Sequence, residues 1–148
     1  MDQPTAGEAL RRLDPLVGEW EIEARGPDGE PWPGSGRFTF EWHPSGAHLV
    51  QRTTVDHPDA PDSVAVIGCD AANGTYTQLY SDDRGVCRVY AMTIDDRTWT
   101  LERQGEPFAQ RWTSTFSEDG DTITGRWWLA EDGSTFRPDF DLVLRRVP

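Results

Sequence analysis

Several polar side chains that could hold a small molecule fall in the same phase of strand alternation as a group of aromatic residues. The set comprises Gln51, Arg88, Arg103 and Gln110 among Trp42, Tyr90, Trp99, Trp112 and Trp127. A buried arginine must meet a carboxylate, a carbonyl, water or a ligand, because leaving it unpaired is costly. The set is therefore either a structural network completed by water or a ligand site with an aromatic body and a few polar anchors. In a ligand site, we expect Arg103 to anchor a carboxylate, phenolate or carbonyl group.

The same residues leave catalysis open as an alternative. A cofactor-free isomerase, cyclase or hydratase needs a shaped cavity, an acid–base group and a hydrogen-bond donor. Tyr90 and Arg103 are the candidates for these roles, with Tyr76 or Tyr80 as substitutes for Tyr90. No G-x-S-x-G serine, C-x-x-C pair or phosphate-binding glycine loop is present, so hydrolase, kinase and redox chemistry are not indicated. A third alternative is a structural or dimerising module whose interior is packed solid.

The histidines do not form a recognisable metal site. His43 and His48 flank a predicted turn at 45–46 and would lie opposite each other on the outer surface, near Glu41. A metal site needs three or four ligands, and this spacing supplies no others, so no metal is expected. His57 lies among aspartates in what is interpreted as a polar loop. Residues 82–85, Asp-Asp-Arg-Gly, lack a calcium-loop pattern and predict a hairpin turn.

Short strands are the elements that would position these residues. Between Gly18 and Val147, runs rich in aromatic and β-branched residues alternate with turn clusters about every ten residues. A meander of about ten strands has two exposed edges unless it closes. We therefore predict one all-β domain over residues 1–148, a closed antiparallel up-and-down barrel spanning about 16–147. A short N-terminal helix at about 5–13, with Thr5 and Glu8 as a capping box, is expected to cap one end.

Alternation assigns an inward face to most of the predicted strands. The inward sets are Trp20, Ile22 and Ala24; Phe38, Phe40 and Trp42; Leu49, Gln51, Thr53 and Val55; Arg88, Tyr90, Met92 and Ile94; Trp99, Leu101 and Arg103; Phe108, Gln110, Trp112, Ser114 and Phe116; Ile123, Trp127 and Leu129; and Phe140, Leu142 and Leu144. Residues 64–70 and 75–81 alternate poorly, and their faces are not assigned. The longest loop, residues 26–36, is expected to be a flap over one mouth of the barrel.

Composition limits the partners and the compartment. The formal net charge of −12 disfavours nucleic acid and anionic membranes, since both require a basic surface. No apolar run is long enough to span a bilayer and no signal peptide is visible, so a cytoplasmic location is expected. Cys69 and Cys87 are predicted at opposite ends of non-adjacent strands and are expected to be free thiols. The expected partner is a small hydrophobic or aromatic molecule, with a homodimer as a further alternative.

The segment Gly18-Glu19-Trp20 after a short helix resembles the G-x-W opening of the calycin superfamily, which includes lipocalins and nitrobindin-like barrels. Residues 68–70 and the closing Leu144-Arg145-Arg146-Val147 are similar to a bacterial lipocalin-like branch. The resemblance implies a small β-barrel that holds apolar ligands. It also implies that a late basic residue, Arg145 or Arg146, packs over Trp20 as a cation–π pair.

Nitrobindin-like members of this superfamily hold haem on a histidine. This chain offers only His43, His48 and His57, all in its first half. The predicted phase of the strands places His43 and His48 on the solvent side, and His57 in a loop. We therefore expect neither haem nor another cofactor.

Overall fold

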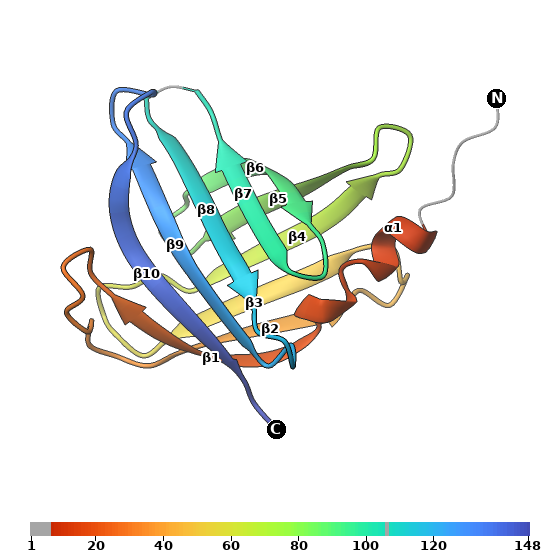
Figure 1. The fold of residues 1–148 in the computed structure, drawn as a ribbon, viewed down its shortest axis with the longest axis horizontal. Coiled ribbons are helices and arrows are strands. Elements are labelled where there is room, and N and C mark those ends of the chain that lie inside the picture. Colours follow the sequence, from red (N-terminus) through yellow and green to blue (C-terminus); the bar gives the residue numbers. More distant parts are fainter. Residues whose placement is uncertain (1–6, 106) are drawn as a thin grey trace.

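The computed structural model describes residues 7–105 and 107–148. A helix, α1 (Gly7–Arg11), and a 3-10 turn, η1 (Asp14–Leu16), precede the strands. The strands are β1 (Gly18–Arg25), β2 (Gly36–Trp42), β3 (Leu49–Val55), β4 (Ser63–Asp70), β5 (Thr75–Asp82), β6 (Cys87–Ile94), β7 (Thr98–Arg103), β8 (Ala109–Phe116), β9 (Thr122–Ala130) and β10 (Arg137–Arg146). Each pairs antiparallel with its neighbour in the chain, and β1 pairs with β10 to close the barrel (Figure 1). The predicted closed up-and-down barrel is confirmed.

The N-terminal segment covers one end of the barrel, as predicted. Figure 1 shows α1 at the end opposite the loop that joins β1 to β2. The helix ends at Arg11, two residues before the predicted end, and Pro15 lies in the separate 3-10 turn that follows. Thr5, the expected cap, lies outside the described residues. Leu13 and Leu16 are fully buried, and the Tyr76 hydroxyl donates a hydrogen bond to the Ala9 carbonyl at 2.7 Å. These contacts hold a segment too short to be a stable helix alone. None of the described helices combines the length and hydrophobicity needed to cross a membrane.

The G-x-W segment and the closing strand form one packed unit. Trp20 is fully buried, and the Arg146 guanidinium lies 4.1 Å from the centre of its ring. Arg146 also donates hydrogen bonds to the Val17 and Pro15 carbonyls. Gly18 has a φ of +130°, and a Cβ there would lie 2.7 Å from Arg146 Nη1, so both the backbone and the neighbouring cation favour glycine. Of the two expected arginines, it is therefore Arg146 that covers Trp20.

The predicted faces hold across the strands that alternate clearly. In β4 and β5, whose faces were not assigned, the buried side chains are Ala65 and Ile67, and Tyr76, Gln78 and Asp82. The outer face of the same strands carries apolar residues that are 40–46% exposed: Val64, Val66 and Leu79. Both faces are thus partly apolar, which removes the alternation signal. In β10 the register shifts between Pro138 and Phe140, a bulge that still leaves Phe140 opposite Trp127.

The cysteines and the first-half histidines lie where the strand order predicts. Cys69 and Cys87 are both free, on β4 and β6 at opposite ends of the barrel, which confirms the thiol prediction. The His43 backbone N–H donates to the His48 carbonyl, and both side chains are exposed. Within the described part of the chain, no three potential metal ligands come together.

Gly125 in β9 is required by close packing against a tryptophan. A Cβ at this position would lie 2.3 Å from Trp112 Cη2 and 2.8 Å from Ser114 Cβ. The Trp112 ring is itself 1% exposed and cannot move outward without disturbing the interior.

We expect Gly125→Ala to lower the free energy of unfolding by about 1–3 kcal/mol, because the added methyl group overpacks the interior. Urea unfolding followed by far-UV circular dichroism measures this loss. Gly68→Ala in β4 is the matched control, since no atom lies within 4 Å of a Cβ built there. Equal stabilities for the two variants would show that Trp112 does not pack on Gly125.

Candidate functional site

The barrel interior contains a cavity of about 640 Å³ at the end opposite α1. Its rim includes residues 32–36, which join β1 to β2, and residues from the loop between β3 and β4, among them His57 and Asp59. The loop expected to be a flap thus contributes to the mouth. The volume lies within the range usual for small-molecule sites.

One wall of the cavity is a continuous series of aromatic rings that begins at Trp99, which packs on Phe40 of the core. Ring centroids are 5.6 Å apart for Trp99 and Trp112, and 5.6 Å apart for Trp112 and Trp127. The series continues through Phe140, 6.4 Å from Trp127, to Trp32 of the loop, 5.1 Å further on. Such a wall offers flat apolar contact area to a planar or hydrocarbon ligand.

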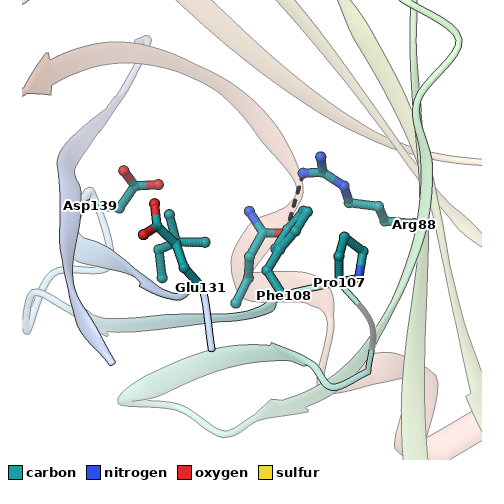
Figure 2. A pocket seen from close by; sticks show the side chains of 7 residues that line it. Arg88, Pro107, Phe108, Glu131 and Asp139 are labelled. Carbon is teal, nitrogen blue, oxygen red and sulfur yellow. Dashed lines mark hydrogen bonds between the residues drawn. The ribbon is translucent and has the colours of Figure 1, made fainter. Parts of the chain in front are cut away.

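Three polar side chains, Tyr90, Gln110 and Arg88, form a hydrogen-bonded cluster beside this wall. The Tyr90 hydroxyl donates to Gln110 Oε1 at 2.8 Å, and Arg88 Nη1 donates to the same oxygen at 3.3 Å. Figure 2 shows Arg88 reaching this oxygen past the ring of Phe108, whose centroid lies 5.0 Å from the guanidinium carbon. Arg88 forms no ion pair with any described residue, whereas most arginines of the chain do. Its remaining N–H groups can therefore bind an anion or a carbonyl.

Burial fixes the chemical role of Tyr90. Its side chain is 3% exposed, and burial raises the pKa of the phenol above its ordinary value. The hydroxyl therefore stays protonated at neutral pH and can donate a hydrogen bond or a proton, but it is a poor general base. If this site were catalytic, Tyr90 would have to act as the acid.

A buried carboxylate supports the rim. Asp82 accepts hydrogen bonds from the Tyr80 hydroxyl at 2.7 Å and from Arg84 Nη2 at 2.6 Å. It also accepts the backbone N–H groups of Arg84 and Val86, closing the turn predicted at residues 82–85. The hydrogen bonds from Arg84 hold the pKa of Asp82 well below its usual range, while burial and Asp82 raise the pKa of Tyr80 to about 12. Both Tyr80 and Arg84 line the cavity.

Four buried polar atoms of the cavity wall have no hydrogen-bond partner among the described residues. They are Gln51 Oε1, Gln78 Oε1, Trp99 Nε1 and Trp112 Nε1. Each belongs to a residue that lines the cavity and is at most 8% exposed. Buried polar groups are nearly always hydrogen-bonded, so this clustering around a single cavity is the expected pattern for a wall that another molecule completes.

The structure brings most of the predicted ligand-binding residues together. The cavity lining includes Gln51, Arg88, Tyr90, Trp99, Gln110, Trp112 and Trp127. Arg103 and Trp42 are not in this lining. Arg103 Nη1 donates to the Phe108 carbonyl at 2.6 Å, with its guanidinium 4.6 Å from the Phe108 ring centroid on the rim. Trp42 ends β2 beside Leu49, at the end of the barrel that α1 covers.

Several lining residues were outside the predicted ligand set. The polar and aromatic ones among them include Gln78 and Tyr80 of β5, Arg84 of the following turn, and Trp32 of the loop. The sequence holds a usable signal for β5, because Tyr76, Gln78 and Tyr80 share one phase while the other phase is mainly threonine and serine. The exposed Leu79 in that second phase obscured it.

A smaller hollow of about 340 Å³ adjoins the mouth (Figure 2). In Figure 2 the carboxylates of Glu131 and Asp139 lie on one side of it, and Arg88 lies on the other. Asp139 is the residue at the β10 bulge, and burial raises the pKa of its carboxyl group. Because Arg88 lines both the hollow and the main cavity, it stands where the two meet.

Comparisons with known proteins support the fold. No family model matches the chain, and no curated protein matches it. Among solved structures, the chain is similar to the crystal structure of Rv2717c from M. tuberculosis, with a TM-score of 0.67 and 16% sequence identity. The match covers 99% of this chain and 100% of that one. Two chains so different in sequence share a barrel architecture, and the likeness carries no statement about ligand or activity.

Proposed function

We propose that this protein binds a small, largely apolar or aromatic molecule carrying an acidic or carbonyl group, inside the barrel. The observation that carries this proposal is that one cavity combines an aromatic wall with Arg88, which forms no ion pair with any described residue. Apolar walls provide affinity, and a few convergent polar groups provide orientation. We also propose that the chain is one of the calycin barrels, because it has the G-x-W opening and a late arginine, Arg146, packed over Trp20.

Arg88 is the better anchor of the two arginines considered. It lines the cavity, and its bond to Gln110 orients the guanidinium beside the aromatic wall. The net charge of −12 disfavours anions overall, so a local cation is needed to hold an acidic ligand. Arg84 also lines the mouth, but Asp82 already neutralises it.

We expect Arg88→Met to weaken the binding of an aromatic carboxylate by about 10-fold or more, since a charge-assisted hydrogen bond is lost. The probe is para-methylphenylpropionate, and its neutral counterpart is the corresponding carboxamide. Tryptophan fluorescence or calorimetry measures the binding of both probes. The wild-type dissociation constants should lie between about micromolar and millimolar, which corresponds to binding free energies of about −8 to −4 kcal/mol.

The neutral carboxamide is the internal control, because Arg88→Met should weaken it much less than the carboxylate. Arg103→Met, run in parallel, tests the anchor expected from sequence alone. Arg52→Met removes the same charge from an exposed position on β3. Equal weakening of the two probes by Arg88→Met would refute the anchor role, and no binding of either probe by the wild-type protein would refute the proposed function.

The cytoplasmic location and the homodimer stay predictions.

A further inference from the structure

The inner part of the cavity carries polar groups that the proposed anchor at the mouth does not use. Gln51 of β3 and Gln78 of β5 lie on either side of β4, where Ala65 is the paired partner of Gln51 and Ile67 is the paired partner of Gln78. Ala65 and Ile67 are both buried and lie two residues apart on β4, so the two glutamines are offset by two residues across this strand. Both glutamines line the cavity and are 8% and 4% exposed.

Neither glutamine is satisfied by the protein. The carbonyl oxygens of both amides lack a hydrogen-bond partner within the described residues. In the part of the chain that the structure describes, the Gln51 amide makes one hydrogen bond, which its Nε2 donates to the Thr53 hydroxyl at a long distance of 3.4 Å. An unsatisfied buried amide costs free energy, whereas leucine or methionine at these positions would fill the same wall without that cost.

The opposite side of the interior carries buried hydrogen-bond donors that also lack a partner among the described residues. Trp99 and Trp112 of β7 and β8 bury indole N–H groups that have no acceptor among the described residues. A primary amide offers a donor and an acceptor side by side, while an indole offers only a donor. A group that both donates and accepts can therefore satisfy a glutamine on one side and an indole on the other. A hydroxyl or a carboxamide has this property, and a methyl group does not.

Resting on the proposed function, we propose that the ligand is polar at both ends: an acidic or carbonyl group meets Arg88, and an uncharged hydroxyl or carboxamide meets Gln51 and Gln78 deep in the barrel. The aromatic wall between them contacts the body of the ligand. The ligand class is thus a hydroxylated or amidated aromatic acid, and not a simple fatty acid or hydrocarbon.

The test compares two probes of nearly equal size, para-hydroxyphenylpropionate and para-methylphenylpropionate, by calorimetry with the wild-type protein. The hydroxyl probe should bind about 10-fold more tightly, the gain expected for satisfying one buried amide. Without the deep polar site the order reverses, because the methyl probe is the more hydrophobic.

The variants Gln51→Met and Gln78→Met keep the side-chain size and remove the amide, so they should abolish the preference for the hydroxyl probe. Gln110→Met is the matched control: this amide is already bonded to Tyr90 and Arg88, and its loss should weaken both probes alike. A crystal structure of the wild-type protein with the hydroxyl probe gives a second readout that needs no variant. It should place the hydroxyl within hydrogen-bond distance of Gln51 or Gln78.

The outcomes separate the two proposals. If both probes bind equally, or the methyl probe binds more tightly, the deep polar site is wrong and the proposed function stands. If the preference for the hydroxyl survives in both glutamine variants, its assignment to these residues is wrong. If neither probe binds, the proposed function fails, and this inference fails with it.

Discussion

Trp20→Ala is expected to lower the free energy of unfolding by about 3–5 kcal/mol, the range for deleting a large buried aromatic side chain. The ring is fully buried, and its Nε1–H donates to the Leu16 carbonyl at 2.9 Å. Its removal also takes away the surface on which the Arg146 guanidinium rests. Because Arg146 holds the carbonyls of Val17 and Pro15, the loss should loosen the N-terminal segment together with the closing strand.

Denaturant unfolding followed by far-UV circular dichroism measures this effect. Trp32→Ala is the matched control, since Trp32 is 45% exposed at the opposite end of the barrel, and a loss below about 1 kcal/mol is expected for it. A loss below about 1 kcal/mol for Trp20→Ala would contradict the packing of Trp20 against Arg146 and the N-terminal segment. A cooperative transition in both variants is needed for the comparison.

Asp82→Ala is expected to cost about 2–4 kcal/mol, because it breaks a buried, charge-assisted network. The Asp82 side chain is fully buried, and the side chain of its partner Arg84 is 54% exposed, which places the loss below that of a fully buried ion pair. The change also leaves the Tyr80 hydroxyl and the N–H groups of the turn without their acceptor. Asp83→Ala in the same turn is the control: Asp83 is exposed, and its removal should cost less than about 1 kcal/mol.

The stability that Asp82 contributes should depend on pH in one direction. Its pKa in the folded protein is lowered by Arg84, so the contribution is complete above the unfolded-state pKa of about 3.9 and is lost as the pH falls through the lower folded value. The difference in unfolding free energy between the wild-type protein and Asp82→Asn should thus be constant from about pH 5 to 7 and shrink below about pH 4. A difference that grows with acidification would contradict the assigned network.

The sequence by itself determined the architecture and most of the interior. Turn clusters about every ten residues and clear alternation in strands such as β1, β2 and β8 suffice to predict a closed meander, because each strand must bury one face. The resemblance of the G-x-W opening and the closing arginines to calycin barrels implied that Arg145 or Arg146 covers Trp20, and Arg146 does so. The turn clusters and the alternation are local in sequence and repeat along the chain, so they can be read without coordinates.

Tertiary structure decided which inward residues meet in the cavity. Alternation gives the side of the sheet, but the depth of a residue along the barrel depends on strand tilt and register, which are properties of the closed sheet. Arg88 and Arg103 share the inward phase, yet only Arg88 lines the cavity, while Trp42 falls at the covered end. The proximity of Gln51 and Gln78 across β4 was also missed, because the exposed Leu79 obscures the phase of β5 and the sequence does not show which strands lie two apart at the same depth.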